Sequence, residues 1–180
     1  MLMIRDQSVL LVVDIQERLL PHIHEGAAVL DHAVWLVKVA RRLDVPVMLS
    51  EQYPKGIGPT VAVLRGLTSP EDIAEKLHFS CVAARCLERL PGAARPQVVV
   101  VGTESHVCVL QTVLDLRTQG KDVFVVAEAV GSRRPSDKEL ALARMRAQGV
   151  EIVSREMVAF EWLRQAGTNE FREISREFLK

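Results

Sequence analysis

The chain has 180 residues, a length that can bury a sizeable core, and we predict one domain spanning residues 1–180. Hydrophobic residues make up 48% of the chain and charged residues 26%. Lys and Arg together number 23, as do Asp and Glu, so a formal net charge of zero leaves no basic field for nucleic acid or anionic lipid. Neither a membrane-spanning apolar run nor a signal peptide is recognisable, and we expect a globular protein without a membrane or nucleic-acid partner.

Strand and helix patterns alternate from the N-terminus. An apolar run over residues 9–14 predicts a strand that ends in a carboxylate, and an amphipathic helix is predicted over residues 29–43. A second strand is predicted at 45–49, followed by a turn-rich loop at 53–59. The next segment has two interpretations, a short strand at 72–76 or a helix that starts near 69–72.

The same alternation continues to the C-terminus. Residues 80–90 read as an amphipathic helix, and four valines within 97–102 predict a fully buried parallel strand. Helices are predicted at 108–119, 137–148 (capped by Ser136), 157–165 and 168–179, with strands at 123–127 and 150–153. This order predicts an α/β fold of three layers, α/β/α, with a mostly parallel, Rossmann-like sheet.

Cys108 follows the valine strand closely. With Ser105 as the N-cap, Cys108 lies in the first turn of a helix, where free N–H groups and the helix dipole favour a thiolate. The helix N-terminus and Lys76 would lower the pKa of Cys108 from its ordinary value of about 8.5, while a nearby Asp14 would raise it, and we expect Cys108 to be the most reactive of the three thiols. The alternative is a buried structural cysteine.

Two more polar residues belong with Cys108 if the strands are parallel. Asp14 ends the first strand, and Lys76 lies in the short segment before Ser80. Ligands of open α/β sheets bind beyond the carboxyl ends of the strands, so a base, a cation and a nucleophile would meet there. The alternatives are a loop-capping carboxylate and a solvated lysine. His106 is only two residues from Cys108, so a dyad of the two is not expected.

The cysteines indicate the compartment. Cys81, Cys86 and Cys108 are odd in number and lack C-x-x-C spacing, which fits a reducing cytoplasm better than a disulfide framework or a zinc site. His22 and His24 are a weak metal signal, and no nucleotide-binding glycine motif is present. We expect no metal and no cofactor.

In several segments the chain resembles the isochorismatase-like cysteine hydrolases. The matching segments are Leu11-Val-Val-Asp-Ile-Gln16, Glu75-Lys-Leu-His-Phe-Ser80 and Val101-Gly-Thr-Glu-Ser-His-Val-Cys-Val109. The segments Pro46-Val-Met-Leu-Ser-Glu-Gln-Tyr-Pro-Lys-Gly-Ile-Gly-Pro-Thr60 and Ala141-Leu-Ala-Arg-Met-Arg146 look like the isochorismatase-domain-containing subgroup. The resemblance implies a six-stranded sheet in the order 3-2-1-4-5-6 and a homo-oligomer.

The resemblance also implies an Asp14–Lys76–Cys108 triad that cleaves a small amide or related C–N bond through a thioester. The backbone N–H groups of Glu104 and Cys108 would form the oxyanion hole, and the Thr103–Glu104 peptide would be cis. Four residues within the matching segments are candidates for the substrate pocket: Gln16, Glu51, Tyr53 and Ser80.

Two departures narrow the activity. The nicotinamidases of this family carry an Asp-x-His metal motif after the second strand, where this chain has Ser50-Glu-Gln-Tyr53. True isochorismatases lack the cysteine, so Cys108 argues against that substrate. Two other hypotheses stay open: a non-catalytic scaffold that keeps the pocket, and a redox sensor that needs Cys81 or Cys86 near Cys108.

Overall fold

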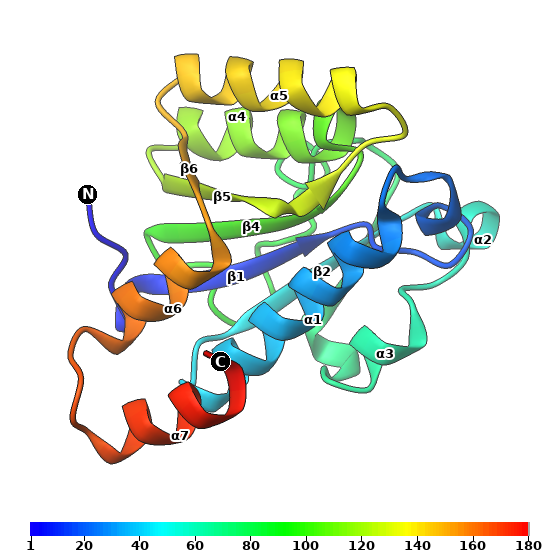
Figure 1. The fold of residues 1–180 in the computed structure, drawn as a ribbon. Coiled ribbons are helices and arrows are strands. Elements are labelled where there is room, and N and C mark those ends of the chain that lie inside the picture. The colour runs from blue at the N-terminus through cyan, green and yellow to red at the C-terminus, as the bar shows by residue number, and fades with distance from the viewer. Residues whose placement is uncertain (180) are drawn as a thin grey trace.

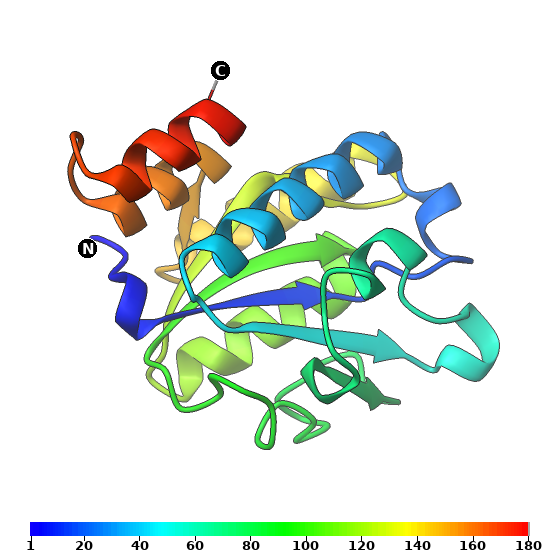
Figure 2. The ribbon, with the colours of Figure 1, turned by 90° about the horizontal axis from the view of Figure 1, so that it is seen from below.

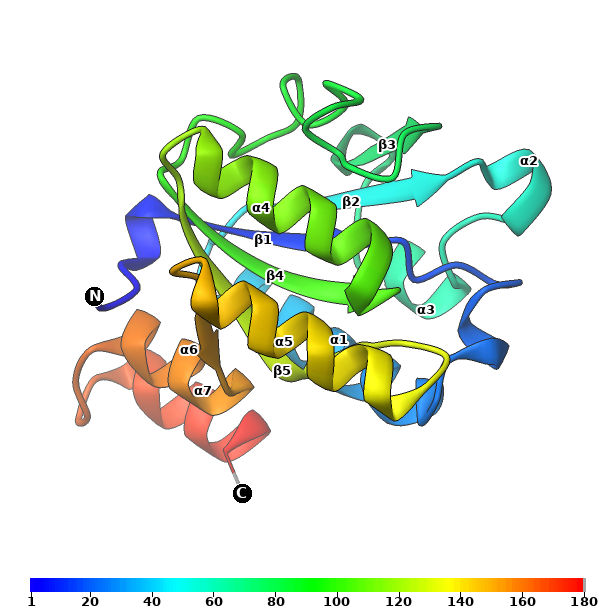
Figure 3. The same ribbon diagram turned by 90° about the horizontal axis from the view of Figure 1, so that it is seen from above.

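The computed structural model describes residues 1–179. Six strands form one sheet in which every neighbouring pair is parallel: β1 (Ser8–Val13), β2 (Val47–Gln52), β3 (Ile73–Lys76), β4 (Gln97–Thr103), β5 (Asp122–Gly131) and β6 (Glu151–Val153). The order is β3-β2-β1-β4-β5-β6, so the predicted sheet is confirmed. Figure 1 shows the strands from β2 to β6, and Figure 3 shows β3 beside β2. The order reverses between β1 and β4, and this is where a ligand site is expected in such sheets.

Helices cover both faces of the sheet, as the alternating pattern predicts. One face carries α1 (Gly26–Arg42), α6 (Arg155–Leu163) and α7 (Asn169–Phe178), which Figure 2 shows together. The other face carries α4 (Leu110–Thr118) and α5 (Pro135–Ala147), seen in front in Figure 3. Shorter elements are α2 (Pro54–Ile57), α3 (Ala62–Arg65), the 3₁₀ turns η1 (Arg5–Gln7), η2 (Leu20–His22) and η3 (Pro70–Asp72), and the π-helical turn η4 (Ser105–Val109). No helix among the described residues has the length and apolarity to cross a bilayer.

The sheet separates two hydrophobic cores. Side chains alternate along β1, so Leu10 and Val12 join the α1-side core, whereas Val9, Leu11 and Val13 join the α4-side core. All six residues of β1 are buried, as a central parallel strand covered on both faces requires. The apolar residues of the two last helices mainly serve the α1-side core: Trp162, Leu163 and Ile174 are buried, while Phe160 is 48% exposed.

Local signals explain several boundaries. The two interpretations of residues 69–76 are both realised, because Ser69 and Asp72 form a capping box around η3 and β3 follows directly. The helix predicted at 80–90 is wrong: one turn forms after Ser80, and Arg85 then takes a positive φ of 54° that ends it. The helix α5 begins at Pro135 after Arg134, so Ser136 is not its cap.

Gly102 is the position in β4 that admits no side chain. Its φ is 144°, and a Cβ atom there would lie 2.2 Å from the carbonyl oxygen of Val13 on the neighbouring strand. We expect Gly102→Ala to lower the free energy of unfolding by about 1–3 kcal/mol more than Gly120→Ala does, because of overpacking. Gly120 is the matched control, since its φ is also positive at 81° but nothing lies within 4 Å of its added Cβ. Urea unfolding of both variants measures the difference, and equal losses would contradict the clash.

Candidate active site

Asp14 lies at the carboxyl end of β1, one residue past the strand, and is fully buried. Its positive φ of 51° breaks the alternation of the strand, and its carboxylate lies against Ser50 of β2. Oδ1 accepts a hydrogen bond from the Ser50 hydroxyl at 2.7 Å, and Oδ2 accepts one from Lys76 Nζ at 2.8 Å. The carbonyl of Asp14 also accepts from Thr103 Oγ1 at 2.6 Å, which ties the end of β1 to the end of β4.

Lys76 is the last residue of the edge strand β3, yet its side chain is inaccessible to solvent. Its ammonium donates to Asp14 Oδ2 and, at 2.7 Å, to Oε1 of Gln52. Burial lowers the pKa of Lys76, but the charge of Asp14, followed by the thiols of Cys108 and Cys81, outweighs burial and leaves the pKa raised. Lys76 is therefore a fixed positive charge at neutral pH.

Cys108 lies in η4, the first turn that follows β4, and is 4% exposed. It packs in the α4-side core with Cys81 and Met48. Burial raises the pKa of the Cys108 thiol and the charge of Asp14 raises it further, while Lys76 lowers it. Of the opposing effects expected on this pKa, desolvation and the neighbouring carboxylate outweigh the lysine and favour the neutral thiol.

The turn before Cys108 differs from the predicted one. The described residues contain no cis peptide bond, so the predicted cis bond between Thr103 and Glu104 is wrong, and the chain turns instead at Glu104 with a φ of 57°. Ser105 is not the N-cap, because Glu104 takes that position without a side-chain cap bond. The carbonyl of Glu104 accepts hydrogen bonds from the backbone amides of Val107 and Val109 but not from that of Cys108. The oxyanion hole at Glu104 and Cys108 stays a prediction.

Two of the candidate pocket residues have their polar atoms engaged within the protein. The Gln16 amide donates to the carbonyls of Gln52 and Gly58 and accepts from the Gln52 amide. The Ser80 hydroxyl donates to Asp115 at 2.6 Å and accepts from the backbone amides of Val82 and Ala83. Both residues hold loops at the carboxyl edge of the sheet.

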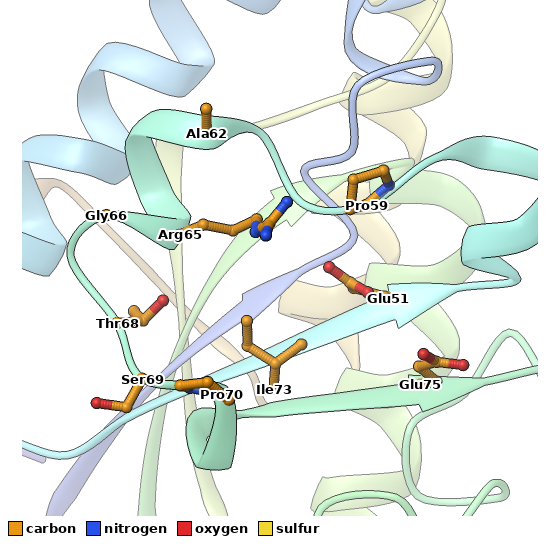
Figure 4. Close-up of a pocket in the computed structure, with 10 residues that line it drawn as sticks. All are labelled: Glu51, Pro59, Ala62, Arg65, Gly66, Thr68, Ser69, Pro70, Ile73 and Glu75. Atoms are coloured by element: carbon orange, nitrogen blue, oxygen red, sulfur yellow. The ribbon is translucent and has the colours of Figure 1, made fainter.

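Two cavities lie near this edge. Tyr53 and Lys76, with Leu77 and His78, line a cavity of about 510 Å³. Glu51 lines another, of about 700 Å³, on the face opposite Ser50 and Gln52, because side chains alternate along β2. Figure 4 shows Glu51 and Glu75 directed into this second cavity from the sheet, with Arg65 reaching in from α3. Tyr53 and Glu51 thus line different cavities, and Glu75 lines both.

Sequence reasoning missed Ser50 and Gln52, although both contact the ion pair. They lie two residues apart on β2, so they share a face, and Gln52 is the register partner of Lys76. Polar residues at alternate positions near the end of an otherwise apolar strand were the available signal. Within residues 1–179, no three His, Cys, Asp or Glu side chains are grouped so as to hold a metal ion.

Comparisons with known proteins show which family of domains the chain matches. Residues 8–157 match the model of the isochorismatase domain. The human isochorismatase domain-containing protein 2 is 40% identical over 172 residues, which cover 94% of this chain and 82% of the relative.

Solved structures superpose over nearly the whole chain. MAR1 ribonuclease from Caenorhabditis elegans has a TM-score of 0.88 at 30% identity, covering 100% of this chain and 93% of its own. YcaC from Pseudomonas aeruginosa, solved with hexane-2,5-diol and covalent acrylamide, has a TM-score of 0.89 at 25% identity and coverages of 99% and 92%. YcaC from Escherichia coli, described as an octameric hydrolase of unknown specificity, shares the fold with a TM-score of 0.86 at 22% identity and coverages of 91% and 83%.

Proposed function

We propose that this chain, which belongs to the isochorismatase family and has its hydrolase fold, hydrolyses a small amide or related C–N bond with Cys108 as the nucleophile. The observation that carries the proposal is the buried ion pair of Asp14 and Lys76, 2.8 Å apart, beside the Cys108 thiol. A thiol next to an oriented carboxylate is the arrangement of an activated nucleophile. The same three groups form the triad that the family resemblance implies.

Because the pKa of Cys108 is raised, the thiol must lose its proton to a base during the reaction. Cys108 rests as a thiol, and its proton passes to Asp14 as Sγ attacks the carbonyl carbon of the substrate. The backbone N–H groups of Glu104 and Cys108 would stabilise the oxyanion that forms. Asp14 then returns the proton to the departing nitrogen, and the C–N bond breaks to leave a thioester on Cys108. A water molecule, deprotonated by Asp14, attacks the thioester and releases the acid and the free thiol.

Lys76 positions this base and does not react. Its ammonium holds Oδ2 of Asp14, and Gln52 holds the ammonium in turn. The Ser50 hydroxyl occupies the other carboxylate oxygen. A carboxylate fixed at both oxygens loses little orientation freedom during proton transfer, which is the benefit of preorganisation.

The substrate class follows from the space near Lys76. The cavity of about 510 Å³ there is lined by Tyr53, Pro54 and Leu77 together with the charged or polar residues Lys55, Glu75 and His78, so a compact substrate with both apolar and polar groups fits. YcaC from Pseudomonas aeruginosa was solved with covalent acrylamide, a small amide, which supports a small amide-bearing ligand for this fold. We further propose a cytoplasmic homo-oligomer, which three free cysteines and the octameric Escherichia coli relative support.

Trapping the thioester tests the proposal directly. The protein is mixed with a panel of small primary amides, quenched in acid and examined by intact-protein mass spectrometry. We expect an added acyl mass that hydroxylamine removes and that Cys108→Ala abolishes, while the control Cys86→Ser keeps it. No adduct and no turnover across the panel would favour a scaffold that retains the pocket, and an adduct on another residue would refute Cys108 as nucleophile.

A further inference from the structure

Cys81 and Cys86 close a single turn of chain. The amide of Cys86 donates to the carbonyl of Cys81 at 3.2 Å, and the amide of Arg85 donates to the carbonyl of Val82 at 2.9 Å. With Arg85 at a positive φ of 54°, these 6→1 and 5→2 bonds form a Schellman motif. The Cys86 thiol also lies 3.5 Å from the Cys81 carbonyl oxygen. The turn therefore holds the two cysteines next to each other.

The turn is anchored on both sides. The amide of Cys81 donates to Thr112 Oγ1 of α4 at 3.0 Å, and Ser80 donates to Asp115 of the same helix. Cys81 is fully buried in the α4-side core together with Cys108, and the half-buried Cys86 packs against this core. All three thiols thus meet in one core, but only Cys81 and Cys86 share a turn.

The two thiols differ in character. The neighbouring Cys86 thiol lowers the pKa of the Cys81 thiol, and Lys76 lowers it further. Burial and the charge of Asp14 oppose this shift but do not outweigh it. The same interaction with Cys81, together with burial, raises the pKa of Cys86. Cys81 is therefore the thiol that more readily becomes a thiolate, and Cys86 keeps the proton.

We propose that Cys81 and Cys86 form a redox-active dithiol that a hydroperoxide oxidises to a reversible intramolecular disulfide. The main-chain bond between residues 81 and 86 brings their Cα atoms near the separation of about 4.4–6.8 Å that a disulfide spans. Cys81, Val82 and Arg85 line a cavity of about 80 Å³, which has room for a small hydroperoxide beside Cys81. This modification site is separate from the proposed hydrolysis and does not depend on it.

The chemistry needs only the peroxide. The Cys81 thiolate attacks one peroxide oxygen, the O–O bond breaks, an alkoxide or hydroxide leaves and takes a proton, and Cys81 becomes a sulfenic acid. Cys86 sulfur then attacks Cys81 sulfur, the S–S bond forms and water leaves with the Cys86 proton. The two thiols are oxidised by two electrons, and the peroxide is reduced to an alcohol, or water, plus water. A dithiol reductant reverses the reaction.

Trypsin makes the test specific, because cleavage after Lys76, Arg85 and Arg89 separates the two cysteines into peptides 77–85 and 86–89. The reduced full-length protein is treated with hydrogen peroxide, blocked with N-ethylmaleimide and digested. We expect these two peptides to become linked by a disulfide, and dithiothreitol to release them. Cys108→Ser should form the link as the wild type does.

Cys86→Ser supplies the second measurement. We expect this variant to lose the linked peptides and to accumulate Cys81 sulfenic acid, which dimedone traps. A disulfide between Cys81 and Cys108 in the wild type, or oxidation of Cys108 while Cys81 and Cys86 stay reduced, would overturn the proposal. Failure of the wild type to form any disulfide under conditions that oxidise its methionines would overturn it as well.

Discussion

Lys76→Met is expected to lower the free energy of unfolding by about 3–5 kcal/mol, the usual cost of removing one partner from a buried ion pair. Both side chains of the pair are inaccessible to solvent, so the change leaves the Asp14 carboxylate desolvated with no cation beside it, although the Ser50 hydroxyl still donates to it. Methionine preserves most of the lysine stem, which separates the loss of charge from the loss of packing. Urea unfolding followed by circular dichroism measures the effect.

Arg42→Met is the control for a solvent-exposed pair. Arg42 contacts Glu173 and Glu177 across α1 and α7, and all three side chains are about half exposed. Such pairs contribute about 0–1 kcal/mol. If Lys76→Met costs no more than this control, the Asp14–Lys76 pair is hydrated in solution and the preorganised base is refuted.

The pH dependence of the same pair has a definite sign. The pKa of Lys76 is raised in the folded protein, so its stabilising contribution is fully present below the ordinary lysine pKa of about 10.4. The contribution falls as the pH rises from that value through the folded pKa. The wild type should therefore lose stability above about pH 10 more steeply than Lys76→Met does.

The sheet and the ion pair were predictable because their signals are local. Asp14 and Lys76 each stand at the carboxyl end of a strand, and parallel strands bring those ends to one edge. Ser50 and Gln52 were missed because their contacts depend on the register of β2 against β1 and β3, which no single segment encodes. Long-range register is decided by how the two cores pack.

The failures have a common physical origin. Residues 80–90 have helical apolar spacing, but Ser80, Cys81 and Thr112 fix one turn against α4 and the chain leaves it at Arg85. Tertiary contacts thus override the local pattern. The pKa of Cys108 is raised for a related reason: the effects of the helix terminus, Lys76 and Asp14 can be anticipated from the sequence, whereas the burial that raises the pKa most is visible only in the fold.

Asp14→Asn should separate the reactivity of Cys108 from catalysis. Removing the base is expected to lower turnover by about 10²–10⁴-fold, the range that general-base catalysis supplies. Alkylation of Cys108 should instead become faster, because the Asp14 charge helps to raise the thiol pKa and Lys76, which lowers it, remains. Asparagine retains an oxygen that accepts from Ser50 or Lys76, but the buried Lys76 ammonium loses its charge partner. A loss of stability similar to that of Lys76→Met is therefore expected, and both variants are compared under conditions in which they stay folded.

Two measurements on the same protein decide this prediction. The rate of iodoacetamide labelling at Cys108 is followed by mass spectrometry as a function of pH, and turnover is measured with the amide that gives the trapped thioester. We expect the labelling profile of Asp14→Asn to shift to lower pH than that of the wild type, because the thiol loses a neighbouring negative charge. Lys76→Met should shift it to higher pH. Undiminished turnover in Asp14→Asn would remove Asp14 as the base, and a parallel fall in labelling and turnover would mean that Asp14 only supports the structure around Cys108.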